Sequence, residues 1–395
     1  MSFELAQKIA DAVLYEGYVL YPYRASSAKN QVRFQFGVLA PRDHCLGEGQ
    51  GAESWEMQTE CLVEPDPEAR VDLKVRCLQL QARTLEEAAG PGAFRPVEFL
   101  DLADELLVAW DEGVERELAI SGLSLSNLVQ EGERRLDFAL PGGTEVEELP
   151  AQKTPEAPDG ELQGRIVRRR WPIAAAVRLS AEPIEGFVRL RVRIENLTPW
   201  PAGSPPARDE LLRRSLLSTH TLLAIAGGAF VSLLEPPEAA RQAAAGCANL
   251  RTWPVLVGPE ESRDLVLSSP IILYDYPAVA PESQGDLCDA TEIDEILTLR
   301  IMTLTDEEKR EARGTDPRAR RIVERADSLP EEIFARLHGA VRSLRPAGSE
   351  PADPRMPEGV AEGVGELPIP TWSEPSSAAS PGALVGWEDF LNPPG

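Results

Sequence analysis

Apolar and polar residues alternate with a period of two in several stretches of the chain. The alternation is clearest at Val71–Cys77, where charged residues separate four apolar ones, and it returns at 34–38 and 188–194. Each stretch predicts a strand with one buried face. Further strands are predicted at 55–64, 252–257 and 264–274, and residues 134–140 are expected to close the first domain. Because turn-rich loops separate strands that are close in sequence, we expect antiparallel sheets rather than βαβ units.

Apolar residues spaced three or four positions apart predict helices. A first helix is expected directly after Ser2, whose side chain can cap it. The segment Phe99–Ile120 carries apolar residues at helical spacing among many acids, and we interpret it as a helix with a solvated acidic face. Asp209–Ala226 is predicted to be a helix that ends at a glycine pair, before a buried strand at Ala229–Leu234.

The clearest signals for the start of a helix lie between residues 305 and 331. Thr305 and Glu308 match a capping box, in which the threonine caps the helix and the glutamate reaches back to it. Ser328 and Glu331 repeat the device. We therefore expect helices at 292–304, at 306–326 with a break at 314–317, and at 329–344.

Two stretches without periodicity divide the chain. Residues 141–164 are rich in proline, glycine and glutamate and predict an acidic linker or loop. From 346 to 395 too little apolar surface is present to offset chain entropy, which predicts a disordered tail. The expected architecture is α+β, with two domains at 1–140 and 165–345 built on mostly antiparallel sheets with flanking helices.

Charge and cysteine usage narrow the classes of function. The net charge of −25 argues against binding to nucleic acid or to an anionic membrane, because phosphates would be repelled. The five cysteines form no CxxC pair, and the first residues carry acids and no apolar signal region. Reduced cysteines and a cytoplasmic location are expected. Ser215–Leu234 has the length of a membrane span, but His220 and the glycine pair interrupt it, so we expect a buried unit.

Motifs of known chemistry are missing from the sequence. It has no Walker A loop, no dinucleotide-binding glycine motif, no nucleophile elbow, no HExxH and no EF-hand loop. His44, Cys45, Cys61 and Cys77 could in principle gather around zinc, but their spacing is not that of a chelate. We expect no cofactor and no metal, and we favour a protein without catalytic activity.

The most unusual local cluster is aromatic. Four of the six tyrosines, namely Tyr15, Tyr18, Tyr21 and Tyr23, fall within nine residues. Aromatic residues at this density either bind a ligand or pack a corner of the fold, and we favour packing. The polar turn that follows is the better candidate for contact with another molecule. The candidate interaction residues are Tyr18, Tyr21, Arg24, Lys29 and Asn30.

Two further segments are candidates for binding. Between Arg165 and Arg193 there are eight arginines and two acids, and Arg189, Arg191 and Arg193 share one face of a predicted hairpin. These arginines either dock an acidic surface or, as we favour, pair with the acidic helix or linker of the chain itself. In the tail, Trp387 and Phe390 stand among acids, which is typical either of a short docking segment or of an inert chain end.

Two strings resemble a known family. YEGYVLYPYRASSAKNQVRFQFGVLAPR (residues 15–42) and EIDEILTLRIMTLTDEEKREARGTDPRARRIVER (residues 292–325) are similar to an uncharacterised protein family associated with nickel–iron hydrogenase gene clusters of high-GC bacteria. The resemblance implies an accessory, assembly or scaffold role, with hydrogenase subunits or maturation factors as protein partners. It implies no catalytic residue. Family members carry a further small β-rich C-terminal region, which a Pro/Ser tail replaces here.

Two alternatives to an accessory protein stay open on the sequence. The chain could be an enzyme with an unrecognised polar–aromatic site near Tyr15–Asn30. It could also be a structural subunit of a larger particle, because Leu329–Leu344 carries a narrow apolar stripe. The oligomeric state is not predicted by any of these patterns.

Overall fold

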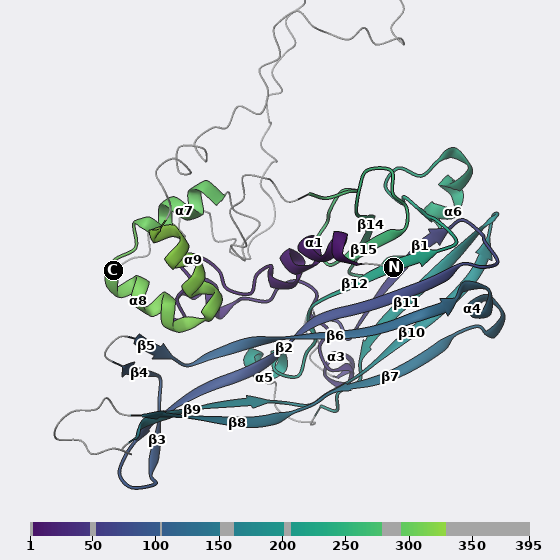
Figure 1. The fold of residues 1–395 in the computed structure, drawn as a ribbon. Helices are drawn as coiled ribbons and strands as arrows, with labels where there is room; N and C mark the ends of the chain where they lie inside the picture. The colour runs from purple at the N-terminus through teal and green to yellow at the C-terminus, as the bar shows by residue number, and fades with distance from the viewer. Residues whose placement is uncertain are drawn as a thin grey trace, which may run out of the picture. The chain divides into compact units, whose positions relative to one another are not determined.

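The structure is a computed structural model that describes residues 3–47, 53–102, 105–150, 162–200, 207–278 and 294–328. All of them belong to one compact unit, Met1–Ala340. The unit combines antiparallel sheets with helices, which confirms the predicted α+β class (Figure 1).

The first sheet has five strands in the order β13-β1-β11-β10-β7, and all neighbours are antiparallel. Its strands are β1 (Glu56–Val63), β7 (Arg134–Leu140), β10 (Ile173–Ile184), β11 (Phe187–Asn196) and β13 (Phe230–Val231). The predicted hairpin is confirmed as β10 and β11, which turn at Glu185 and Gly186. Its apolar residues Val188, Leu190 and Val192 are buried, as the alternation requires.

The second sheet is organised around β2 (Arg70–Ala88), which has 19 residues. One side of β2 pairs first with β12 and then with β9, and the other side pairs with β6 and then with β3. Beyond β12 lie β15 and β14, and beyond β9 lies β8. The bounds are β3 (Phe94–Val97), β6 (Trp110–Ser124), β8 (Gly143–Pro150), β9 (Leu162–Arg170), β12 (Leu217–Ala226), β14 (Trp253–Leu256) and β15 (Leu265–Ser269). A separate hairpin joins β4 (Phe99–Leu102) to β5 (Glu105–Val108).

The two sheets share one apolar core. Met57 and Leu190 from the first sheet belong to the same buried cluster as Leu73 and Leu223 from the second. The contact also includes a polar link, because the hydroxyls of Thr59 and Ser268 lie 2.7 Å apart across the sheets. Face-to-face packing of this kind buries the alternating apolar residues of both sheets at once.

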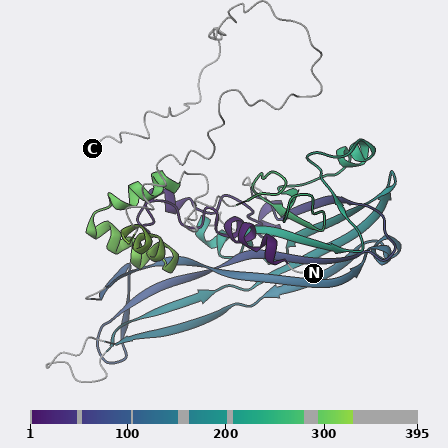
Figure 2. The ribbon, with the colours of Figure 1, turned by 45° about the horizontal axis from the view of Figure 1, so that its top comes forward.

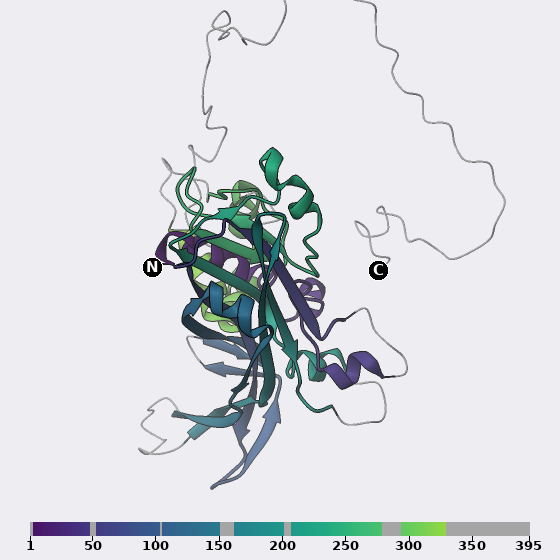
Figure 3. The ribbon, with the colours of Figure 1, turned by 90° about the vertical axis from the view of Figure 1, so that its right-hand side faces the viewer.

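Helix α1 (Glu4–Tyr15) covers the opposite face of the second sheet. Ala6, Ala10 and Val13 of the helix pack on Leu222 and Ala224 of β12. The helices α7 (Asp294–Met302), α8 (Asp306–Thr315) and α9 (Pro317–Asp327) gather beside the N-terminal segment, as the purple and green ribbons of Figures 2 and 3 show. The remaining helices are short: α2 (Ala28–Gln31), α3 (Arg42–Leu46), α4 (Leu125–Glu131), α5 (Arg208–Leu212), η1 (Glu238–Ala240) and α6 (Arg241–Ala245).

The predicted capping box is confirmed. The hydroxyl of Thr305 accepts the backbone N–H of Glu308 at 3.2 Å, and the Glu308 carboxylate accepts the backbone N–H of Thr305 at 2.9 Å. The predicted helix break is confirmed too, because α8 ends at Thr315 and α9 begins at Pro317 with Asp316 as its cap. The second capping box and the predicted helix at 329–344 lie outside the described residues.

The predicted helix at Phe99–Ile120 is wrong, because this segment forms β4, β5 and most of β6. Its apolar residues Leu102, Leu106 and Trp110 are four positions apart, and an even spacing suits one face of a strand as well as one face of a helix. From Val114 to Ile120 half-buried and exposed residues alternate strictly. That period of two identifies a strand.

The predicted helix at Asp209–Ala226 is also wrong beyond its first turn. Only α5 is helical, and β12 begins at Leu217. Residues 217–225 are all buried, because α1 covers one face of β12 and the first sheet covers the other. A strand buried on both faces loses its alternation and cannot be told from a helix by periodicity. Within the described ranges, no helix has the length and apolar character needed to cross a bilayer.

The sheets join residues from both sides of the predicted linker. β1 pairs with β11, and β2 pairs with β9 and β12. The predicted linker at 141–164 itself contains β8 and the start of β9, with 151–161 outside the described residues. A division into 1–140 and 165–345 therefore does not describe these sheets, because periodicity predicts strands but not their partners.

Candidate functional site

The tyrosine-rich stretch passes beside the C-terminal helices and binds them. Tyr18 is 2% exposed, and its hydroxyl donates to Asp316 at 2.7 Å and accepts the N–H of Gly113 at 2.9 Å. Burial raises the pKa of the Tyr18 hydroxyl well above its usual range, so it remains a donor. Tyr15 donates to Glu115 of β6. These contacts fasten the end of α1 to β6 and to the start of α9.

The turn after the tyrosines is fastened to α8 in the same way. The Arg24 guanidinium lies 3.2 Å from Glu308 and 3.7 Å from Glu311. Asn30 is buried and braces the turn from within, accepting from the N–H of Leu20 at 2.8 Å and donating to the carbonyls of Leu20 and Arg24. Of the predicted interaction residues, Tyr18, Arg24 and Asn30 therefore contact this chain itself.

Tyr21 and Lys29 lie nearer the surface. Tyr21 donates its hydroxyl to the carbonyl of Arg300 at 3.5 Å, and the Arg300 guanidinium lies 5.5 Å from its ring. Lys29 is exposed on α2. The N-terminal stretch thus reaches α7, α8 and α9 together, and we call this contact region the joint.

Two buried arginines that the sequence analysis missed support the joint. Arg83 of β2 donates to the carbonyls of Gly314 and Thr315 at 2.9 and 2.6 Å, at the end of α8. The last carbonyls of a helix lack intrahelical donors, so this arginine satisfies groups that burial would otherwise leave unpaired. Burial lowers the pKa of Arg83, while the Glu112 carboxylate opposes the shift. The sequence does offer one signal for this site: Arg83 is a charged residue within a strand that is otherwise largely buried.

Arg33 occupies an aromatic setting next to the joint. Its guanidinium carbon lies 3.5 Å from the centre of the Trp110 ring and 4.7 Å from that of Phe34. It also donates to the carbonyls of Tyr18 and Asp111. Burial lowers the pKa of Arg33 to about 10. The cation stays charged at neutral pH and anchors the N-terminal stretch to β6.

Gly314 shows how closely the joint approaches the rest of the chain. A Cβ atom at this position would lie 1.5 Å from the carbonyl oxygen of Leu106 in β5. No side chain fits at that distance, so a glycine is required where α8 crosses β5.

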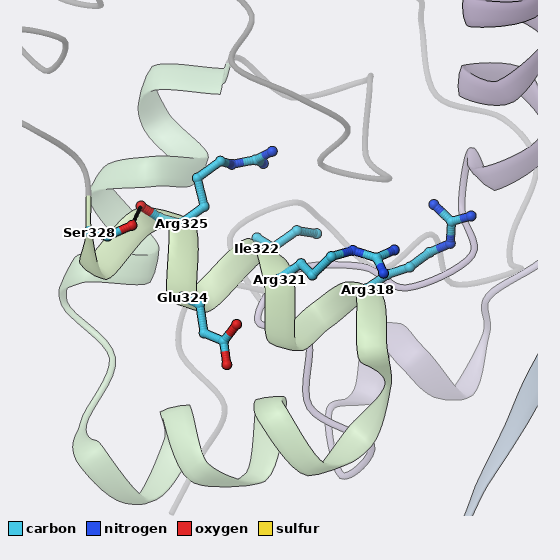
Figure 4. Close-up of a pocket in the computed structure, with 6 residues that line it drawn as sticks. All are labelled: Arg318, Arg321, Ile322, Glu324, Arg325 and Ser328. Atoms are coloured by element: carbon cyan, nitrogen blue, oxygen red, sulfur yellow. Dashed lines mark hydrogen bonds between the residues drawn. The ribbon is translucent and has the colours of Figure 1, made fainter.

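The outer side of the joint carries a groove along α9. It has a volume of about 440 Å³ and is lined by Arg318, Arg321, Ile322, Glu324, Arg325 and Ser328 (Figure 4). The three arginines are spaced by three and four positions, so they share one side of the helix. Figure 4 shows the Glu324 side chain pointing away from them. Arg318 is held in place by the Tyr15 ring at 3.1 Å and by Glu115 at 3.3 Å.

Helix α7, which packs beside α9, adds apolar surface. Leu297 and Ile301 of α7 are buried in the core cluster of the joint. Ile296, Leu299 and Met302, at a spacing of three, are 41%, 37% and 48% exposed. The joint therefore presents arginines and large apolar side chains on neighbouring helices, a combination common at protein interfaces.

The arginines on one face of the hairpin bind side chains and backbone carbonyls of this chain itself. Arg191 binds Glu60 of β1 at 2.5 Å, and Arg189 donates to Glu182 and to the carbonyl of Gly246. For these two arginines the carboxylates come from strands β1 and β10. The prediction that the basic segment pairs with the acidic segment and the linker of the chain itself is confirmed for Arg168, which binds Glu112 and Glu147, and for Arg170, which binds Glu145.

The third arginine of that face follows the same pattern. Arg193 donates to the Gln58 side chain at 2.8 Å and lies 3.7 Å from Glu56. Both partners are on β1, which neighbours β11 in the first sheet. Trp387 and Phe390, the remaining predicted residues, lie outside the described part of the chain.

The sequence candidates for zinc do not gather. Cys61 and Cys77 are buried in the apolar core between the sheets, where burial raises the pKa of the Cys77 thiol to about 12. Across the described residues, no three His, Cys, Asp or Glu side chains are placed to hold a metal ion.

Comparison with known proteins adds no family assignment. No family model matches the chain, and no curated protein is significantly similar to it.

Proposed function

We propose that this protein is a non-catalytic accessory, assembly or scaffold protein that binds another polypeptide through the joint, and that a nickel–iron hydrogenase is the assembly it serves. The binding role is argued from the surface of the joint. The hydrogenase as partner is argued from the resemblance of residues 15–42 and 292–325 to proteins of hydrogenase gene clusters.

The observation that carries the proposal is the contact between those two strings. They are distant in sequence, yet Tyr18 binds Asp316, Arg24 pairs with Glu308, and the N–H of Ala25 donates to the hydroxyl of Thr315 at 3.1 Å. The residues that carry the resemblance thus build a single local structure. Its outward side holds the α9 groove and the α7 apolar side chains.

The chemistry of this outward side favours an amphipathic acidic segment as the ligand. Arg321 can pair with a carboxylate, and Arg side chains do so with two parallel hydrogen bonds. Ile296 and Leu299 can cover apolar residues of the same segment. A helix laid across α7 and α9 with acids on one side and apolar residues on the other would meet both.

The test is affinity purification of the tagged chain from its native host, followed by identification of the captured polypeptides. Hydrogenase subunits or maturation proteins are expected with the unaltered chain. The double variant Arg321→Glu/Arg325→Glu should lower their recovery at least tenfold. The matched control is Arg95→Glu/Arg241→Glu, which makes the same charge change at exposed arginines on other elements.

Two results would overturn parts of the proposal. Capture of no hydrogenase polypeptide would remove the hydrogenase as partner. Equal recovery with the groove variant and the control variant would remove the joint as the binding surface.

A further inference from the structure

We propose that the protein has an oxyanion site, separate from the joint, in which Arg169 and Arg214 bind the phosphate group of a small phosphate monoester. The two arginines come from the end of β9 and from the chain between α5 and β12. Both lie against the ring of Trp171, with their guanidinium carbons 4.9 and 6.0 Å from its centre. The site involves no polypeptide partner, so it stands or falls independently of the function proposed above.

The aromatic contacts leave the donors of these arginines available. A guanidinium can stack on an aromatic ring through its face, while its five N–H donors lie in its own plane and point away from its edge. Arg214 is held by a second ring as well, since its guanidinium carbon lies 5.4 Å from the centre of Trp200. The rings therefore position the two side chains without using their hydrogen-bonding capacity.

A third arginine at the same ring shows what the other two lack. Arg213 lies 5.4 Å from the centre of Trp171, and its Nε and Nη2 atoms each donate to a carboxylate oxygen of Asp111 at 3.0 Å. Within the described residues, by contrast, no carboxylate pairs with Arg169 or Arg214, and no acceptor takes a hydrogen bond from either side chain. Two positive charges thus stand beside one ring without a counter-charge from the described part of the chain.

Two fully buried amides fix the backbone of this region. The Gln79 side chain donates to the carbonyl of Trp171 at 2.8 Å, and the Asn196 side chain donates to the carbonyl of Arg214 at 2.9 Å. Asn196 also donates to the carbonyl of Leu39 at 2.8 Å, which ties the Arg214 backbone to the segment before α3. Because the ring and the arginines are anchored to the core, binding requires little further ordering of the protein.

Charge balance favours a phosphate monoester over a carboxylate as the bound group. One carboxylate carries a single negative charge, and Asp111 supplies just that to Arg213. A phosphate monoester carries about −1.5 to −2 at neutral pH and has three acceptor oxygens. A single phosphate group can therefore accept from both Arg169 and Arg214, which lie within 6.0 Å of the same ring centre, and neutralise both.

The net charge of −25 limits the size of the ligand but does not exclude the site. At physiological ionic strength, exposed charges more than about 8 Å apart are largely screened from each other. The nearest other arginines are already paired, Arg170 with Glu145 and Arg213 with Asp111, so Arg169 and Arg214 dominate the local field. A long polyanion would extend beyond this region onto acidic surface, whereas a small molecule would not.

The neighbouring rings indicate the nature of the organic part. Trp200 and His44 of α3 are half-buried, and their ring centres lie 5.4 Å apart in an edge-to-face arrangement beside Arg214. Aromatic rings with one exposed side offer apolar surface to a flat group. The ligand class that we assign is therefore a phosphate monoester of a small aromatic molecule.

The experiment is isothermal titration calorimetry with four small probes. Phenyl phosphate is the expected ligand type, phenyl sulfate has the same shape with one negative charge fewer, benzoate supplies a carboxylate, and inorganic phosphate lacks the organic part. The site variant is Arg169→Gln/Arg214→Gln. The matched control is Arg95→Gln/Arg134→Gln, which makes the same charge change at exposed arginines on other strands. Thermal unfolding of the three chains checks that the fold is kept.

Phenyl phosphate should bind the unaltered chain and the control variant equally, and the site variant at least tenfold more weakly. Phenyl sulfate and benzoate should bind the unaltered chain at least tenfold more weakly than phenyl phosphate, and inorganic phosphate several-fold more weakly. Absence of phenyl phosphate binding, or equal binding to the site and control variants, would overturn the site. Phenyl sulfate or benzoate binding as tightly as phenyl phosphate would overturn phosphate as the bound group, and equally tight inorganic phosphate would overturn the aromatic part of the ligand.

Discussion

The arginine-rich hairpin and the joint use arginine in opposite ways. On the hairpin, Arg189, Arg191 and Arg193 are partly exposed and pair with acids of neighbouring strands, of which Glu60 is buried. In the joint, Arg83 and Arg33 are buried and bind backbone carbonyls. The hairpin has the larger local excess of positive charge in the sequence. Yet a partly exposed ion pair such as Arg193–Glu56 contributes little to stability, whereas removal of a buried cation leaves the carbonyls that it bound without a donor and is strongly destabilising.

The strongest test of this contrast is Arg83→Met. The substitution leaves the carbonyls of Gly314 and Thr315 buried without a donor, so we expect a loss of about 3–5 kcal/mol in the free energy of unfolding. Urea denaturation measures it. The control Arg95→Met removes an arginine that is 69% exposed and should cost under about 0.5 kcal/mol. An equal loss in the free energy of unfolding for the two variants would show that the buried arginine is no more important to stability than the exposed one.

The pH dependence of stability has a contribution from His220, which lies in neither the hairpin nor the joint and has to be known before the two regions are compared. His220 of β12 is fully buried, and burial lowers its pKa to about 4. The unfolded chain, with a histidine pKa near about 6.5, binds the proton first. Stability is therefore complete above about pH 6.5 and declines as the pH falls toward 4, by roughly 3 kcal/mol in total.

The measurement for this prediction is the free energy of unfolding at several pH values for the unaltered chain and for His220→Gln. The variant should lose the part of the slope between pH 6.5 and 4 that comes from this residue. Parallel pH profiles for the two chains would contradict it.

Tyr18→Phe tests the joint at intermediate size. It removes the hydrogen bonds to Asp316 and Gly113 while keeping the ring, and we expect a loss of about 1–3 kcal/mol. Thermal unfolding should show a lower melting temperature, and capture of the partner should be unchanged at a temperature where the chain is folded. Weaker capture with unaltered stability would mean that Tyr18 contacts the partner directly.

The smallest effect is expected on the hairpin. Arg193→Gln removes a partly exposed contact to Glu56 and the hydrogen bonds to Gln58, and it should change the free energy of unfolding by about 1 kcal/mol, with partner capture unaffected. Chemical denaturation at low and high salt measures it. A large loss at both salt concentrations would show that the hairpin arginines support the fold as the joint arginines do.

Local patterns in the sequence predicted the elements that depend on local interactions. The strand at Val71–Cys77, the hairpin and the Thr305–Glu308 capping box all follow from residues a few positions apart. β6 and β12 were missed for two physical reasons: a spacing of four fits both a helix and a strand, and a strand buried on both faces shows no alternation.

Long-range partners were not predictable from one sequence. The basic face of the hairpin was visible, but Glu60 lies 131 positions from Arg191, and nothing local identifies it as the partner. Nor does any local pattern connect Arg83 with the end of α8, 231 positions away. The tyrosine-rich stretch was correctly interpreted as packing for Tyr18, whereas the α9 groove appears only once α7, α8 and α9 are assembled.

The 19 residues of β2 also set the order in which a ribosome can complete this fold. β2 leaves the ribosome early, but β9 and β12, its neighbours along one side, end at Arg170 and Ala226. During synthesis of the intervening residues a long strand with one apolar face has one edge unpaired, and such nascent chains aggregate readily. Production of this protein should therefore depend on chaperones that hold the early half until the later strands emerge.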